Sequence, residues 1–269
     1  MNNRAYVFTG TETQFVCATT AFKRIRELGS ILPIFFYSED NLNIEKYQNI
    51  INEYLINIIK IEDIYKSNFS YKIQAIILCE CDEIIFCDCD VLPIWNLEIL
   101  FNDSIFLRNG YVLFKDAQKS HYRDKTPQTD SGVMVWNKML HQMNLISCRE
   151  FTENNHMGIA MGDKESYYYV LGIIEHQPDM PDFIGFKIDK KFFGCSMLHY
   201  YDNKPLFIHS TLMKFNFEIH NFPIWSHIFR NTHNNLIHKK SSLYNRYFIG
   251  NETTELVSEE IRILNKYWQ

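Results

Sequence analysis

The stretch KIQAIILCECDEIIFCDCDVLPI, residues 72–94, decides the fold. Apolar residues recur at helical spacing near its start, which predicts a helix over Ser70–Leu78. The run Glu83–Cys87 is almost continuously apolar, as in a strand buried on both faces, and it leads directly into Asp88 and Asp90. A helix followed by a buried strand that ends in acids is typical of α/β proteins, which bind ligands at the carboxyl ends of their strands.

The residues before this stretch repeat the same alternation of strand and helix. Arg4–Phe8 is apolar enough for a strand, and Thr11 with Gln14 fits the capping box of a following helix. Gly29 stands where a glycine commonly ends a helix, and Leu32–Tyr37 is a second buried-strand run. The opening of the chain therefore predicts one βαβ unit and a parallel sheet.

The residues after this stretch continue the pattern less regularly. We expect strands at Tyr111–Phe114 and Val133–Trp136, a short helix over Glu165–Ile174, strands and turns over Phe192–Ile208, and a closing helix over Leu256–Tyr267. The predicted fold class is α/β, with a single Rossmann-like mixed sheet flanked by helices and a helical appendage at the C-terminus.

Composition limits the functional classes. The chain has 269 residues, and Lys+Arg 27 against Asp+Glu 32 leaves a net charge of −5. Such a chain lacks the uniform positive charge with which proteins bind nucleic acid non-specifically, so we expect no nucleic-acid partner. No apolar run approaches the roughly 18 residues of a membrane helix, and the N-terminus lacks a signal-peptide pattern. Seven cysteines, an odd number, favour reduced thiols over a disulfide framework. We expect a cytoplasmic protein without a membrane span.

Asp88 and Asp90 are the first candidate site. Side chains alternate faces in an extended chain, so carboxylates separated by one residue can point the same way. Two such oxygens suit Mg²⁺ or Mn²⁺, which commonly bridge a protein to substrate phosphates. The alternative for so short a motif is a solvated strand end.

Four cysteines near these acids suggest a zinc site as another possibility. Cys79, Cys81, Cys87 and Cys89 offer four thiols, but each pair is separated by a single residue rather than by the usual two to four. Buried free thiols are therefore the favoured interpretation.

Further candidates lie later in the chain. His209 ends the apolar run Pro205–Ile208 and could complete a metal site, and Lys214 could hold a phosphate. Asp130 with Ser131 precedes a predicted strand, and the segment 162–165 precedes a predicted helix. Taken alone, each is equally well explained as a structural histidine, a turn or a helix cap.

The order of these motifs resembles the fungal-type α-1,3-mannosyltransferases, glycosyltransferase family 71, from about Ala5 to Lys214. The resemblance implies a GT-A glycosyltransferase domain over residues 1–214, with residues 215–269 as an extension packed on it. It also implies a nucleotide-sugar donor such as GDP-mannose, Mn²⁺ or Mg²⁺, and retention of the anomeric configuration. We expect the acceptor to be a glycan or glycoconjugate. The motifs are TGTETQF, LPIFFY, residues 72–94, QTDSGVMVWNK, GDKESYYYVLG, FFGCSML and LFIHSTLMK.

The sequence departs from the family pattern in two respects. Fungal members carry a membrane anchor that this sequence does not show, so compartment and acceptor are not taken from the family. In the related glycogenin-like family a glycine separates the late His from the Lys, whereas residues 210–213 intervene before Lys214.

The resemblance also implies roles for individual residues. The implied metal ligands are Asp88, Asp90 and His209, and Asp88 is also implied at the donor ribose. The residues implied at the nucleotide-sugar are Thr9, Gly10, Thr11 and Ser131. Those implied near the transferred sugar are Asp130, Asp163, Lys164 and Glu165.

Two other functions stay open at this point. A nucleotidyltransferase that forms nucleotide-sugars would share the layout and the metal, although TGTETQF lacks the glycine-rich basic loop expected of it. A catalytically silent module that binds nucleotides or carbohydrates is the second. Retention of configuration itself allows either a protein nucleophile or same-face attack by the acceptor, and the sequence does not choose between them.

Overall fold

The computed structural model describes residues 3–62, 68–119, 127–154, 163–188 and 191–210. The predicted helix over Leu256–Tyr267, the extension 215–269 and Lys214 lie outside these residues. Among the helices that are described, none is long and apolar enough to span a bilayer.

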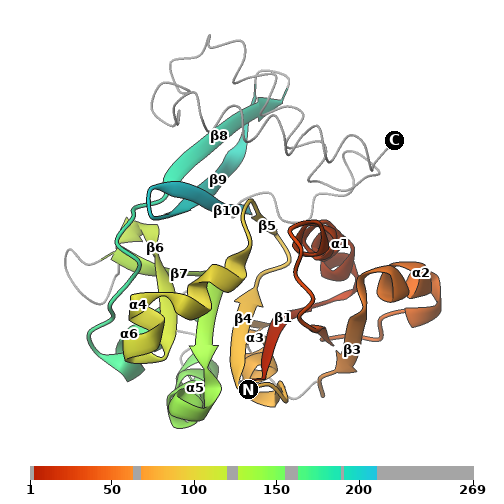
Figure 1. The fold of residues 1–269 in the computed structure, drawn as a ribbon, viewed down its shortest axis with the longest axis horizontal. Helices are drawn as coiled ribbons and strands as arrows, with labels where there is room; N and C mark the ends of the chain where they lie inside the picture. Colours follow the sequence, from red (N-terminus) through yellow and green to blue (C-terminus); the bar gives the residue numbers. More distant parts are fainter. Residues whose placement is uncertain (1–2, 63–67, 120–126, 155–162, 189–190, 211–269) are drawn as a thin grey trace.

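A six-stranded sheet with strand order β3-β2-β1-β4-β7-β6 forms the centre of the molecule (Figure 1). The first four strands in this order run parallel, whereas β7 is antiparallel to both β4 and β6. Because β7 runs the other way, Gly132 and Val133 in its middle lie beside the carboxyl end of β4. The strands are β1 (Arg4–Gly10), β2 (Ile34–Ser38), β3 (Ile56–Lys60), β4 (Glu83–Cys87), β6 (Tyr111–Lys119) and β7 (Pro127–Asn137).

Helices cover both faces of this sheet. Ile85 and Cys87 of β4 pack into the core beneath α1, α2, η1 and α4, and Ile84 and Phe86 pack into the core beneath α3, α5 and α6. Burial on both faces explains why β4 is apolar at successive positions. The helices are α1 (Glu12–Glu27), α2 (Ile44–Tyr54), α3 (Asn68–Leu78), the 3₁₀ helix η1 (Leu97–Asn102), α4 (Ser104–Asn109), α5 (Lys138–Asn154) and α6 (Lys164–Leu171).

A second, antiparallel sheet lies above the carboxyl ends of the parallel strands (Figure 1). Its order is β5-β10-β9-β8, and the pairing of β10 with β5 sets His209 opposite Val91. This register joins the last described strand to the segment that follows β4. The strands are β5 (Val91–Pro93), β8 (Asp182–Ile188), β9 (Lys191–Tyr201) and β10 (Lys204–Ser210).

The predicted α/β class is confirmed, and the four-stranded second sheet is an addition to the expected single sheet. The strand Glu83–Cys87 has the predicted bounds, and Gly29 follows α1 with φ of +86°, a conformation that favours glycine. Helix α5 was not predicted. Its first turns expose Met139, Leu140 and Met143, so its apolar residues do not mark a single buried face.

Candidate metal centre

Asp88 and Asp90 lie in a tight turn directly after β4. The amide of Val91 donates to the carbonyl of Asp88 at 3.1 Å, and the amide of Asp88 donates to the carbonyl of Gly132 on β7 at 2.8 Å. The expected extended conformation is wrong here, because a turn rather than strand alternation brings the carboxylates together. Asp90 is buried, and the Asp88 side chain keeps 16% of its surface exposed.

His209 reaches the two aspartates from the second sheet. Its Nε2 lies 3.7 Å from Oδ2 of Asp88 and 3.4 Å from Oδ1 of Asp90. One ligand atom from each of the three residues lies within 4.8 Å of the others, so the predicted ligands occur together. Carboxylate oxygens and an imidazole nitrogen are donors that Mn²⁺ accepts, and Mg²⁺ prefers the oxygens. The residues present therefore fit a divalent cation.

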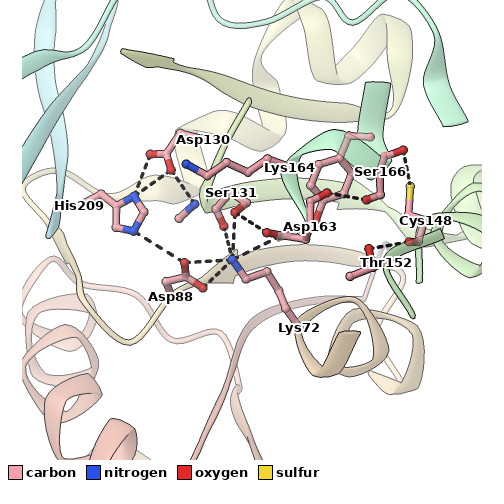
Figure 2. Close-up of polar contacts among 12 residues, drawn as sticks. Lys72, Asp88, Asp130, Ser131, Cys148, Thr152, Asp163, Lys164, Ser166 and His209 are labelled. Atoms are coloured by element: carbon pink, nitrogen blue, oxygen red, sulfur yellow. Dashed lines mark hydrogen bonds and ion pairs between the residues drawn. The ribbon is translucent and has the colours of Figure 1, made fainter. Parts of the chain in front are cut away.

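Asp130 contacts the Nδ1 side of the His209 imidazole (Figure 2). Nδ1 of His209 donates to the two carboxylate oxygens of Asp130 at 2.8 and 2.9 Å. Burial lowers the pKa of His209, but the Asp130 and Asp90 carboxylates outweigh it and raise the pKa to about 10. Burial alone would raise the pKa of Asp130, yet His209 and His199 hold it well below its usual value. Asp130, predicted beside the sugar, is thus fully buried against the histidines.

Lys72 of α3 belongs to this site and was missed from the sequence. Its Nζ lies 2.9 Å from Oδ1 of Asp88 and donates to Oγ and the carbonyl of Ser131 at 3.0 and 3.1 Å (Figure 2). Nζ is also 3.4 Å from Oδ2 of Asp163, and the side chain is only 9% exposed. The available signal was a lysine inside the otherwise largely apolar run of residues 71–77. Lysine is rarely buried without a partner, so such a position indicates a buried ion pair.

Asp163, at the N-cap position directly before α6, contacts the same lysine. Its Oδ1 accepts from Oγ of Ser131 at 3.1 Å, and its Oδ2 accepts from the hydroxyl of Tyr167 at 3.0 Å. Asp163 and Ser131 are both buried. The structure therefore connects the predicted segments around residues 130 and 163 to Asp88 through one ammonium group.

The two residues after Asp163 point elsewhere. Nζ of Lys164 pairs with the carboxylate of Asp116 on β6. Burial lowers the pKa of Lys164, but the surrounding carboxylates of Asp130, Asp116 and Asp163 outweigh it and raise the pKa. Glu165 is buried, and Nε2 of Gln128 donates to it at 3.0 Å. Neither residue is in the group of ligand atoms at Asp88.

The loop after β1 adjoins the aspartate turn. Sγ of Cys89 donates to the carbonyl of Thr9 at 3.2 Å, and Oγ1 of Thr9 donates to the carbonyl of Tyr37 at 2.9 Å. Glu39, at the end of β2, has a pKa of about 7, raised by burial first and by the nearby Asp40 and Asp88 carboxylates. The carboxyl ends of β1, β2 and β4 thus meet at one edge of the sheet.

Gly10 and Thr11 make this loop compact. A Cβ on Gly10 would lie 2.6 Å from Cβ of Gln14, so a larger residue would displace the first turn of α1. The amide of Thr11 donates to Oε1 of Gln14 at 2.6 Å, which confirms that half of the predicted capping box. Thr9 and Gly10 therefore end β1, and Thr11 alone joins it to α1, with Thr9 in contact with Cys89 between the two aspartates.

The four cysteines of residues 79–89 do not meet. Cys79 and Cys81 precede β4, whereas Cys87 and Cys89 lie at and beyond its carboxyl end. All four are buried free thiols. Because a strand of five residues separates the pairs, they cannot share one zinc ion.

Part of the chain matches a known protein family. Residues 3–126, slightly less than half of the chain, match the family model described as "Mannosyltransferase putative". The matched segment contains the first loop, Lys72 and both aspartates, but not Asp130, Asp163 or His209. A search of curated proteins finds no match.

Similar solved structures are glycosyltransferases of low sequence identity. The glycosyltransferase GlyE of Streptococcus pneumoniae TIGR4 is 19% identical over 65% of this chain and 45% of its own, with a TM-score of 0.49. The galactosyltransferase LgtC, solved with donor and acceptor sugar analogues, is 14% identical over 61% and 69%, with a TM-score of 0.48. Mouse xyloside xylosyltransferase 1 is 18% identical over 64% and 81%, with a TM-score of 0.43. The matched region spans less than half of GlyE.

Proposed function

We propose that this chain is a metal-dependent retaining glycosyltransferase that moves mannose from GDP-mannose to a hydroxyl group of a glycan. The observation that carries this proposal is the convergence of Asp88, Asp90 and His209 within 4.8 Å at the carboxyl ends of the parallel strands. The family match of residues 3–126 supports sugar transfer, and its description supports mannose.

Asp88, Asp90 and His209 are the residues that would hold Mn²⁺ or Mg²⁺ in this proposal. A divalent cation bound there supplies positive charge to the diphosphate of the leaving nucleotide. The Asp88 side chain is partly exposed and is the one through which the protein would reach the donor ribose. Thr9, Gly10 and Thr11, at the junction of β1 and α1, are the residues that would lie against the nucleotide. Lys214, which lies outside the described residues, stays a candidate for the phosphate.

Lys72 organises the sugar end of the proposed site. It binds Asp88, Ser131 and Asp163 together, so it fixes the distance between the metal ligands and the start of α6. Its charge also offsets part of the negative charge of the two carboxylates. Holding these groups before the donor arrives lowers the cost of orienting them during transfer.

Retention is proposed to proceed by same-face attack of the acceptor rather than through a covalent intermediate. The candidate nucleophiles Asp163 and Glu165 are 1% and 2% exposed, and both accept hydrogen bonds within the protein. A buried, hydrogen-bonded carboxylate is a weak nucleophile because attack would cost it those bonds. Asp130 is excluded as a nucleophile by its contacts with His209.

A donor screen tests the function. Purified chain is incubated with a set of GDP- and UDP-sugars with and without Mn²⁺, and released nucleoside diphosphate is measured. We expect Mn²⁺-dependent hydrolysis that is fastest with GDP-mannose, and an α-linked product by NMR once an acceptor is found. Metal-independent release or a β-linked product would overturn the proposal. Pyrophosphate-dependent conversion of a nucleotide-sugar into a nucleoside triphosphate and a sugar 1-phosphate would instead identify a nucleotidyltransferase. Tight nucleotide binding without turnover would identify a silent binding module.

A further inference from the structure

Three groups of the protein contact the carboxylate of Asp130, which has no exposed surface. Nδ1 of His209 donates to it at 2.8 Å, and the amide of Gly132 donates to Oδ1 at 3.1 Å. On the other side, Nε2 of His199 lies 2.7 Å from Oδ2. A fully buried carboxylate requires such compensation. Here the compensation comes from a second histidine that has no other role in the proposed reaction.

His199 is fixed by aromatic packing. It lies on β9 opposite Phe207 of β10, and the two rings stack with centroids 4.4 Å apart and an interplanar angle of 12°. The ring of Phe114 meets His199 edge-on at 5.6 Å. His199 is 1% exposed, so its imidazole cannot turn away from Asp130 without opening the core.

Gly132 provides the space for the His209 ring. A Cβ at position 132 would lie 2.4 Å from Nδ1 of His209 and 2.6 Å from its Cε1. Any other residue there would displace the imidazole from Asp130. The backbone of β7 and the side chain of Asp130 thus define one position for the ring.

From these contacts we infer that His199, Asp130 and Gly132 are positioning residues that aim Nε2 of His209 at the cation site. This inference rests on the proposed metal centre. A cation bound at this site would displace the Nε2 proton that the ring of His209 carries in its absence. With Nδ1–H committed to Asp130, the lone pair of the ring then stands on Nε2, which faces Asp88 and Asp90. Outer partners of this kind typically change metal affinity about 10–100-fold when they are removed.

Mn²⁺ affinity measured from the EPR signal of the free ion tests the inference without an activity assay. His199→Phe keeps a ring against Phe207 but removes the contact with Asp130, so we expect Mn²⁺ binding about 10–100-fold weaker. His141→Phe is the matched control, because His141 also packs edge-on against an aromatic ring, that of Trp136, but bonds to the carbonyl of Asn109. It should bind Mn²⁺ like the parent. His199→Gln, whose amide can donate to Asp130, should recover part of the loss.

The outcomes separate this inference from the proposed function. If the parent chain binds no Mn²⁺, both are overturned. If the parent binds Mn²⁺ and His199→Phe is folded and binds equally well, only the role of His199 is overturned. Should His199→Phe fail to fold, long-range ¹H–¹⁵N spectra of the parent chain with Mg²⁺ decide. The inference requires the ring proton of His209 on Nδ1 and that of His199 on Nε2, and the opposite placement of either overturns it.

Discussion

The buried acids at the two ends of β4 have different partners. At the amino end, Glu83 is buried and its Oε2 accepts from Nε of Arg4 at 2.8 Å, so one acid has one cationic partner. At the carboxyl end, four carboxylates gather around the ammonium of Lys72 and the rings of His199 and His209. These carboxylates are Asp88, Asp90, Asp130 and Asp163.

The difference lies in the balance of charge rather than in burial. A buried acid matched by one arginine contributes to the fold and needs no ligand. A group in which carboxylates outnumber the cations of the chain is costly unless a further cation joins it. The carboxyl end of β4 therefore has the composition of a ligand site, whereas the amino end has that of a structural pair.

The largest expected effect is that of Asp90→Asn. The amide offers a neutral oxygen in place of a charged one, so Mn²⁺ binding and donor turnover should fall by more than about 100-fold, with the fold retained. Calorimetric titration with Mn²⁺ and the donor-hydrolysis assay measure the two losses. Asp82→Asn, at the amino end of the same strand, is the control and should leave both unchanged. Full activity of Asp90→Asn would remove the metal centre from the proposal.

Lys72→Met should separate stability from metal binding. Methionine keeps most of the side-chain length but leaves Asp88 and Asp163 without their shared ammonium, which should cost about 3 kcal/mol of unfolding free energy. Because a competing positive charge is lost, Mn²⁺ should bind at least as tightly and should restore part of the stability. Urea unfolding with and without Mn²⁺ measures this. A variant that loses Mn²⁺ affinity while keeping its stability would contradict the contacts described for Lys72.

Glu39→Gln should change the pH dependence of stability. Burial raises the pKa of Glu39 from an unfolded value of 4.5 to about 7, so the folded state favours the neutral acid and loses stability as pH rises through that window. The amide should be more stable than the parent by about 2 kcal/mol near pH 8 and nearly equal to it near pH 4.5. Thermal melts across this range test it, with the exposed Glu45→Gln as control. Parallel curves for parent and Glu39→Gln would rule out the raised pKa of this half-buried acid.

Glu83→Gln is expected to have the smallest effect. The Arg4 side chain is 33% exposed, so its guanidinium can be solvated when its partner becomes neutral, and the loss should be about 1 kcal/mol. Mn²⁺ affinity should not change. A measured loss of Mn²⁺ binding would show that the ion pair at the amino end of β4 affects the cation site at its carboxyl end.

The sequence by itself determined the elements whose signals are local. The apolar run Glu83–Cys87 identified the central strand, Thr11 and Gln14 marked the start of α1, and Gly29 marked its end. A strand buried on two faces, a helix cap and a residue with positive φ each require particular residue types at a few neighbouring positions. A short stretch of sequence is therefore enough to predict them. Asp88 and Asp90 were predicted because they directly follow this apolar run, but the turn between them was not predicted.

Tertiary structure alone decided which distant residues meet. His209 approaches Asp90 because β10 pairs with β5 in one register, and the sequence supplied that pairing only through a family resemblance. The place of Lys72 in a largely apolar run indicated a buried ion pair without identifying its partner, and His199 had no local signal of a role. Their chemistry depends on what lies opposite them after folding, which is Asp88 for one and Asp130 for the other. Patterns of spacing cannot record contacts across such separations, because these are set by the packing of whole elements.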